Sequence, residues 1–200
     1  MSGRGGKAVV CLSGGVDSTT AMALALSEGR EVYALTLDYG QVCRAELDAA
    51  AAVADSLGAS RHLVMPLDLR RIGGSALTGD MEIPKGRGAE ETGSGIPPTY
   101  VPARNIILLS VALGWAEALG AGEVHIGVSQ VDYSGYPDCR KEFIDTFQKM
   151  SDVSTRSGVE GNPVKIVAPF ISISKAEIIR LGTRLGIDYS QTVSCYCPDP

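Results

Sequence analysis

Short apolar and β-branched runs alternate along this chain with stretches of helical length, which is the pattern of a mainly parallel sheet with crossover helices. The first run, Ala-Val-Val-Cys-Leu at residues 8–12, is apolar without alternation. A strand of this kind is covered on both faces, so we expect it at the centre of the sheet. The pattern predicts strands over Lys7–Leu12, Glu31–Leu37, Arg61–Pro66, Glu123–Ser129 and Val164–Ala168.

Glycines and one capping motif mark the ends of the helical stretches. Glycine just past the last turn is a common helix stop, and Gly29, Gly58 and Gly120 take that place here. Ser174-Lys-Ala-Glu177 has the form of a capping box, in which serine and glutamate each accept the other's amide. The predicted helices are Ser18–Glu28, Arg44–Leu57, Asn105–Leu119 and one from Ser174 to Leu181 or beyond.

These elements predict an α/β fold, a three-layer structure whose mainly parallel five-stranded sheet carries helices on both faces. Residues 69–98 depart from this scheme, with seven glycines, three prolines and little periodicity. A loop of that length is usually functional or disordered. Because elements of the same sheet resume directly after it, we expect residues 1–200 to form a single domain.

Composition and charge narrow the range of partners. A formal charge of −5 gives no broad basic field for nucleic acid or an anionic membrane. The apolar stretch before Ser13 is too short for a signal peptide or a membrane span. Five cysteines, mostly far apart, favour a reducing compartment. We expect a cytoplasmic protein that binds neither nucleic acid nor membrane, and the sequence leaves a homodimer open.

The residues between the first strand and the first helix carry the clearest chemistry. Two successive glycines, Gly14 and Gly15, let the backbone turn sharply and bring amides against a ligand. The following helix adds unpaired N–H groups and a partial positive charge, and nearby hydroxyls are further donors. Phosphate or pyrophosphate suits this arrangement. The predicted nucleotide-binding residues are Leu12, Ser13, Gly14, Gly15, Val16, Asp17, Ser18, Thr19, Thr20, Ala21 and Met22.

Spacing excludes two better-known phosphate loops. No lysine stands where a Walker A loop requires one, and the Gly-x-Gly-x-x-Gly of a dinucleotide fingerprint is absent. Asp17 would repel a polyphosphate unless a cation lay between them, so ATP with Mg²⁺ is the expected ligand. The alternative from the residues alone is a Gly-Gly turn in which Asp17 and Ser18 merely cap the helix.

The octet from Ser13 to Thr20 resembles the Ser-Gly-Gly-x-Asp-Ser loop, or PP-loop, of the N-type ATP pyrophosphatases. These enzymes split ATP into AMP and pyrophosphate while adenylating a substrate, and the resemblance implies their adenine nucleotide alpha hydrolase-like fold. Further segments narrow the resemblance to the 7-cyano-7-deazaguanine synthase family of the queuosine and archaeosine pathways. They are residues 38–41 with Arg44 and Glu46, residues 101–105, residues 131–140 and residues 192–196.

This resemblance implies a ligase that works in two stages and uses ATP in each. The carboxylate of 7-carboxy-7-deazaguanine is adenylated and displaced by ammonia, and the resulting amide is then activated and dehydrated to the nitrile. Catalysis of this kind is mainly positioning and charge neutralisation around phosphate. Two other functions stay open at this point: a related amide-forming PP-loop enzyme acting on another small carboxylate, and a catalytically impaired nucleotide-binding module.

Three residues form the predicted catalytic group. Asp17 is the candidate Mg²⁺ ligand. Arg104 could pair bidentately with phosphate or carboxylate, whereas the alternative is a solvated arginine at a helix start. A positive side chain is unfavourable at that end of a helix, which favours the functional role. Lys175 begins another helix, and we expect it to contact phosphate.

The predicted substrate-binding residues follow the second and fourth strands, at the edge where open α/β sheets bind ligands. The loop after the fourth strand offers carboxylates for the guanidine-like edge of a deazaguanine and rings for stacking. The alternative there is a tight turn with exposed polar residues. The predicted set is Tyr39, Gln41, Asp132, Tyr133, Tyr136, Asp138 and Arg140.

The resemblance also implies a structural Zn²⁺ held by four cysteines, of which Cys195 matches the first. A structural zinc site needs four protein ligands, and nothing after Cys197 supplies the rest. We therefore expect the zinc segment to be incomplete after residue 195. Truncation, ligands from a partner chain and a zinc-free variant are three explanations, and we favour truncation.

Overall fold

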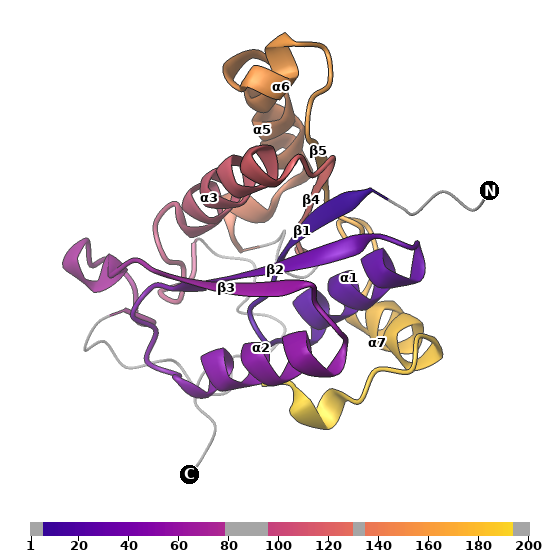
Figure 1. Cartoon of the computed structure of the whole chain (residues 1–200). Coiled ribbons are helices and arrows are strands. Elements are labelled where there is room, and N and C mark those ends of the chain that lie inside the picture. Colours follow the sequence, from indigo (N-terminus) through magenta and orange to yellow (C-terminus); the bar gives the residue numbers. More distant parts are fainter. Residues whose placement is uncertain (1–5, 79–95, 130–134, 194–200) are drawn as a thin grey trace.

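The computed structural model describes residues 6–78, 96–129 and 135–193. It contains a five-stranded sheet of order β3-β2-β1-β4-β5 in which every neighbouring pair is parallel (Figure 1). The apolar first strand lies at the centre, as its pattern predicts. The strands are β1 Lys7–Cys11, β2 Glu31–Asp38, β3 Arg61–Pro66, β4 Glu123–His125 and β5 Lys165–Val167.

Helices join the strands and cover the sheet. The α-helices are α1 Val16–Ser27, α2 Ala45–Ser56, α3 Arg104–Leu119, α5 Lys141–Ser154, α6 Arg156–Val159 and α7 Lys175–Arg184. The described segments also contain the short 3₁₀ turns η1 Leu69–Arg71, η3 Pro137–Cys139 and η4 Tyr189–Gln191.

Successive residues of β1 point to opposite faces of the sheet, and each face has its own helices. Val9 and Cys11 belong to the core beneath α3 and α5, whereas Val10 and Leu12 belong to the core beneath α1 and α2. Figure 1 shows these two helix layers on either side of the sheet, with α7 beside α1. The predicted three-layer α/β architecture is therefore confirmed.

The fourth strand and the region after it differ from the prediction. β4 has three residues instead of the seven predicted, because the chain leaves the sheet after His125. The residues that follow, Gly127 and Val128, line a cavity. No helix was expected where α5 and α6 lie. Phe143, Ile144 and Phe147 of α5 recur at helical spacing and pack on the core, so the sequence did contain that signal.

The segment from 69 to 98 is partly packed against the domain core. Leu69 and Leu77 share an apolar cluster with Leu37, Tyr39 and Val101. The amide of Ala76 donates to the carbonyl of Pro98 at 2.8 Å. Residues 79–95 lie outside the described part of the chain. Strands from both sides of this segment share one sheet, and the single-domain division stays a prediction.

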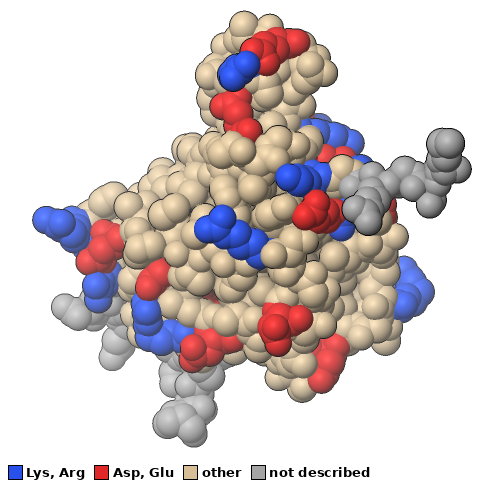
Figure 2. Space-filling model, viewed as in Figure 1, with Lys and Arg blue, Asp and Glu red and all other residues tan. Residues whose placement is uncertain are grey.

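Charged side chains of both signs are interspersed over the face drawn in Figure 2, without a large basic patch on the part of it that is described. Among the helices of the described segments, none combines the length and the apolar character that crossing a bilayer requires.

The capping box at the start of α7 is confirmed and offers a test of the fold. Ser174 Oγ accepts the amide of Glu177 at 3.4 Å, and Glu177 Oε2 accepts the amide of Ser174 at 2.8 Å. We expect Ser174→Ala to lower the free energy of unfolding by about 1 kcal/mol, because the amide of Glu177 loses its acceptor and Glu177 Oε2 loses the hydrogen bond from the Ser174 hydroxyl. Urea unfolding measures this change.

Ser27→Ala is the matched control, since the hydroxyl of Ser27 donates only to the carbonyl of Leu24 in the last turn of α1. It should leave stability nearly unchanged, because alanine is the better helix former. Equal losses in the two variants would show that the box contributes nothing.

Candidate active site

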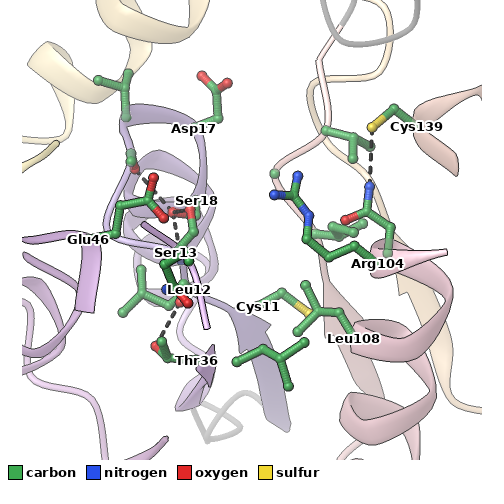
Figure 3. Close-up of a pocket in the computed structure, with 18 of the residues that line it drawn as sticks. Cys11, Leu12, Ser13, Asp17, Ser18, Thr36, Glu46, Arg104, Leu108 and Cys139 are labelled. Carbon is green, nitrogen blue, oxygen red and sulfur yellow. Dashed lines mark hydrogen bonds between the residues drawn. The ribbon is translucent and has the colours of Figure 1, made fainter. Parts of the chain in front are cut away.

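A cavity of about 260 Å³ opens at the carboxyl ends of the central strands. The chain builds β2 and β3 on one side of β1 and β4 and β5 on the other. The cavity lies at this switch point, where open α/β sheets bind ligands. In Figure 3, Ser13, Asp17, Ser18 and Glu46 face Arg104 and Leu108 across it. Other lining residues include Cys11, Leu12, Gly15, Val16, Thr36, Tyr39, Gln41, Asn105, Gly127, Tyr136, Cys139, Lys175 and Val193.

The octet from Ser13 to Thr20, called the phosphate loop from here on, presents the amino end of α1 to this cavity. Gly15 is the N-cap and has no side chain to occupy the first amides of the helix. Ser18 holds the loop closed, because its hydroxyl donates to the carbonyl of Gly15 at 3.1 Å and accepts the amide of Ser13 at 3.1 Å. The first-turn amides are thus left for an anion, which is the arrangement that binds phosphate.

Two glycines let other backbone segments touch this loop. Gly14 has φ +80°, and a β-carbon there would collide with the backbone of Glu46 and Ala50 in α2. Gly127 follows β4, and a β-carbon there would lie 2.8 Å from the amide nitrogen of Ser18. The loop is therefore clamped between α2 and the end of β4 at distances that only glycine allows.

Asp17 and Lys175 meet at the mouth of the cavity. Lys175 Nζ donates to both carboxylate oxygens of Asp17 at 2.7 Å. The Asp17 side chain is 15% exposed and that of Lys175 is 44% exposed, so water screens this pair on one side. Two residues predicted separately are thus brought together by the packing of α7 on α1.

Arg104 reaches the cavity from the first turn of α3. Its guanidinium lies 5.4 Å from the centre of the Tyr39 ring and donates to the Tyr39 hydroxyl at 3.2 Å. The preceding residue, Ala103, is the one non-glycine residue of the described chain with positive φ, at 56°. Strain of this kind clusters at functional sites, and Ala103 is the N-cap of the helix that begins with Arg104.

Tyr39 and Gln41 both line the cavity from the loop after β2. Each is about 5% exposed, at 6% and 5%. Gln41 Oε1 accepts the amide of Tyr39 at 3.1 Å, which folds the loop back on itself. Burial raises the pKa of Tyr39, so its hydroxyl stays protonated as a donor.

Asp138 has a structural position that the sequence did not suggest. Its carboxylate accepts the amide of Asn105 at 3.0 Å, and the side-chain amide of Asn105 donates to the Asp138 carbonyl at 3.1 Å. Asp138 therefore caps α3 from 33 residues away, because Ala103 cannot. Burial raises the pKa of the Asp138 carboxyl, opposed by the Asn105 hydrogen bond.

The other predicted substrate residues lie at different depths. Tyr136 lines the cavity, and its hydroxyl shares a hydrogen bond of 2.8 Å with Thr99. Asp138 and Arg140 do not line the cavity, and Arg140 is the exposed N-cap of α5. Asp132 and Tyr133 lie outside the described residues, as does Cys195.

Four predicted nucleotide-binding residues sit behind the loop. Ala21 and Met22 are fully buried in the cores beneath α1. Thr20 donates to the carbonyl of Val16 at 2.7 Å and shares a hydrogen bond of 2.8 Å with Tyr189. Thr19 is 1% exposed and faces a groove on the far side of α1. A nucleotide contact from these four side chains stays a prediction.

The structure adds residues that were not among the predicted site. Gly127 and Glu46 have been placed above. Cys11 and Cys139 also line the cavity, and burial raises the pKa of Cys11 to about 12, so that thiol stays neutral. Thr36 donates to the carbonyl of Leu12 at 2.7 Å. Of these, Glu46 and Cys139 stood in segments that the sequence had already singled out.

A short segment before the end of the described chain braces the phosphate loop. The amide of Val193 donates to the carbonyl of Gly14 at 3.0 Å. Because Thr20 donates to Val16, it accepts the hydrogen bond from the Tyr189 hydroxyl. The Tyr189 ring crosses α7 at Gly182, where a β-carbon would fall on it. Both ends of the loop are therefore tied to residues 189–193.

Comparison with known proteins identifies a family and two relatives that share one name. A profile of the family described as "Queuosine biosynthesis protein QueC" matches residues 7–200. The 7-cyano-7-deazaguanine synthase of Saccharophagus degradans is 57% identical over 191 residues, 95% of this chain and 83% of that protein. That of Geotalea daltonii is 56% identical over 195 residues, 97% of this chain and 83% of that protein.

Solved structures support the fold. NMN synthetase from Francisella tularensis matches 94% of this chain and 64% of its own, with a TM-score of 0.54 at 15% identity. U34-tRNA thiolase from Methanococcus maripaludis matches 98% of this chain and 62% of its own, with a TM-score of 0.52 at 16% identity. Both likenesses bear on the architecture alone and agree with the adenine nucleotide alpha hydrolase-like fold.

The glycine clamp predicts that Gly127→Ala weakens both stability and nucleotide binding. The new methyl group would meet the backbone of Asp17 and Ser18, which cannot move aside without shifting the first-turn amides. We expect a loss of about 1–3 kcal/mol in the free energy of unfolding and weaker binding of a non-hydrolysable ATP analogue by calorimetry. Gly122→Ala is the control, since nothing lies within 4 Å of its added carbon; matching losses there would refute the clamp.

The hydrogen bond from Tyr189 to Thr20 predicts that Tyr189→Phe weakens binding of the same ATP analogue. The ring is kept, but Thr20 loses its donor and the first turn of α1 is held less firmly. We expect the dissociation constant to rise about threefold to tenfold, which is the effect of one hydrogen bond. Tyr33→Phe removes a hydroxyl that donates only to Glu31 at the surface and should change nothing. Equal affinities for the two variants would contradict the brace.

Proposed function

We propose that this chain, which belongs to the queuosine biosynthesis protein QueC family, is an ATP-dependent carbon-nitrogen ligase, a 7-cyano-7-deazaguanine synthase. It converts 7-carboxy-7-deazaguanine and ammonia to the nitrile through adenylated intermediates. The chain spans 83% of the length of the two relatives compared above. The observation that carries the proposal is the phosphate loop, whose uncapped helix amides face a cavity that also holds a cationic arginine and lysine.

The main requirement of this reaction is that the protein hold the phosphates of ATP beside the substrate carboxylate. A carboxylate is a poor electrophile until its oxygen becomes part of a good leaving group, and adenylation supplies one. The amides of Gly15, Val16 and Asp17, at the uncapped start of α1, would donate to pyrophosphate oxygens. Arg104 faces them across the cavity and would neutralise the charge that develops between carboxylate and α-phosphate.

Mg²⁺ fits beside Asp17 as a partner of the bound nucleotide. Carboxylate and phosphate oxygens are the ligands that Mg²⁺ prefers, and one or two carboxylates suffice when phosphate supplies the rest. Within the described residues no group of three or more acidic, histidine or cysteine side chains could hold a metal alone. Asp17 would therefore bind the ion with the nucleotide, and Lys175 would move from the carboxylate to phosphate.

The substrate base would lie between the loop after β2 and α3. Tyr39, Gln41 and Tyr136 line that part of the cavity and offer rings and an amide for a flat purine-like base. Asp132 and Tyr133 belong to the proposal from the sequence alone. So do the zinc site at Cys195, a homodimer and a cytoplasmic location.

The proposed reaction predicts pyrophosphate and AMP release that depends on 7-carboxy-7-deazaguanine, ammonium and Mg-ATP together. Mass spectrometry should detect the nitrile. Release with another small carboxylate only would favour a different ligase, and binding of ATP without any release would favour a nucleotide-binding module. Either result would contradict the proposed function.

Asp17→Asn should lower Mg²⁺-dependent turnover by at least about 10²-fold, because the Mg²⁺ ion at the reacting phosphate would lose its carboxylate ligand. Its stability should change little, since Lys175 keeps access to water. The rate at saturating Mg-ATP and the urea unfolding midpoint measure the two effects. A rate equal to that of the unaltered protein would show that Asp17 serves only the helix end.

A further inference from the structure

The proposed reaction releases protons that some group must accept, and the following assignment rests on that proposed function. Ammonium must lose one proton before its nitrogen attacks the acyl-adenylate, and the adduct loses another as AMP leaves. In the second stage the amide nitrogen loses both of its protons while the C–O bond to AMP breaks and the C≡N bond forms. A base beside the phosphate loop would serve every one of these steps.

We propose that Glu46 is the catalytic base, and that its carboxylate accepts protons from the attacking ammonia nitrogen and from the amide nitrogen. It lies in the first turn of α2 and lines the cavity. The backbone of that turn touches the phosphate loop at Gly14. Figure 3 shows Glu46 on the same side of the cavity as Ser13 and Ser18, with Arg104 on the opposite side.

The other acid-base groups near the cavity are engaged or unsuited. Both oxygens of Asp17 accept hydrogen bonds from Lys175, and Asp138 caps α3 outside the cavity lining. His62 hydrogen-bonds to Thr36 and does not line the cavity. By contrast, no hydrogen bond or ion pair to the Glu46 carboxylate is present within the described residues.

The surroundings of Glu46 suit a proton acceptor. Burial raises the pKa of its carboxyl above the ordinary range, and the guanidinium of Arg104 on α3 opposes that rise. The Tyr39 hydroxyl is the other titratable group coupled to it. An unpartnered acid with a raised pKa in a cavity is a common mark of a catalytic base, because a carboxylate near neutrality accepts protons more readily.

The proton balance is complete without a further reactant. In the first stage the Glu46 carboxylate takes one proton from ammonium, and the electron pair of the resulting ammonia forms the C–N bond. A second proton leaves the nitrogen of this adduct for the carboxylate as the C–O bond to AMP breaks. In the second stage the N–H electron pairs become the π bonds of the nitrile, and the amide oxygen leaves on AMP. Because the carboxylate holds one proton at a time, each proton passes from the carboxyl to water before the next one is accepted.

Glu46→Gln separates this role from the adenylation that defines the proposed function. With the carboxylic acid and Mg-ATP but no ammonium, the pyrophosphate burst should equal that of the unaltered protein, because adenylation needs no base. Amide formation and conversion of supplied amide to nitrile should each fall by about 10²-fold or more. Stability at pH 8 should not decrease, since a charge in a partly buried place is removed.

The pH profile supplies a second readout. In the unaltered protein, amide formation should fall as pH drops through the raised pKa of Glu46, because protonated glutamate accepts nothing. In Glu46→Gln the rate of amide formation should lose that dependence and follow only the concentration of free ammonia. It should then rise about tenfold per pH unit below the pKa of ammonium. Added ammonium should not rescue nitrile formation from the amide.

Asp48→Asn is the matched control, an exposed acid in the same first turn of α2. It should leave the burst and both later steps unchanged. If Glu46→Gln reduces the pyrophosphate burst as much as the later steps, Glu46 acts in adenylation and the assignment is overturned. It is also overturned if the burst, amide formation and nitrile formation are all unchanged. An unaltered protein without any burst would contradict the proposed function itself and the assignment with it.

Discussion

The closeness with which backbone segments approach the phosphate loop constrains the rest of the site. A helix amino end binds phosphate only if its first amides are bare and fixed in direction. Gly14 and Gly127 meet this need from opposite sides, because each lets another backbone touch the loop where a β-carbon would collide. The loop therefore carries its geometry without a capping side chain, and α2 and the end of β4 are held in register with it.

Charge in the cavity is balanced by groups from distant parts of the chain. Asp17 in α1 is paired by Lys175 from α7, and Arg104 from α3 stacks on Tyr39 after β2. Polyphosphate would add negative charge to this arrangement, and the lysine and arginine are the groups that can turn towards it. Glu46 stands apart because no cation contacts it among the described residues. Burial raises the pKa of this proposed base, and the positive charge of Arg104 opposes that rise.

Several contacts that hold the elements around the cavity in place join residues far apart in sequence. Asp138 caps the helix that carries Arg104, across 33 residues, and Tyr189 supports the first turn of α1 across 169. Sequence spacing gives no sign of either contact. A carboxylate next to Pro137 looks as suitable for a substrate as for a remote helix end, and only its buried hydrogen bond to Asn105 distinguishes the two.

By itself the sequence determined the architecture and the phosphate loop, because strand and helix periodicity, glycine stops, the Ser174 capping box and the Gly14-Gly15 turn are local properties. The sequence prediction made β4 too long, because an apolar run does not show where the chain leaves the sheet. It also missed the helix α5. Tertiary structure alone decided that Thr20 turns away from the cavity, that Asp17 meets Lys175 and that Glu46 faces the same space. Those outcomes depend on how separate helices pack on one sheet, and no short stretch of sequence encodes that packing.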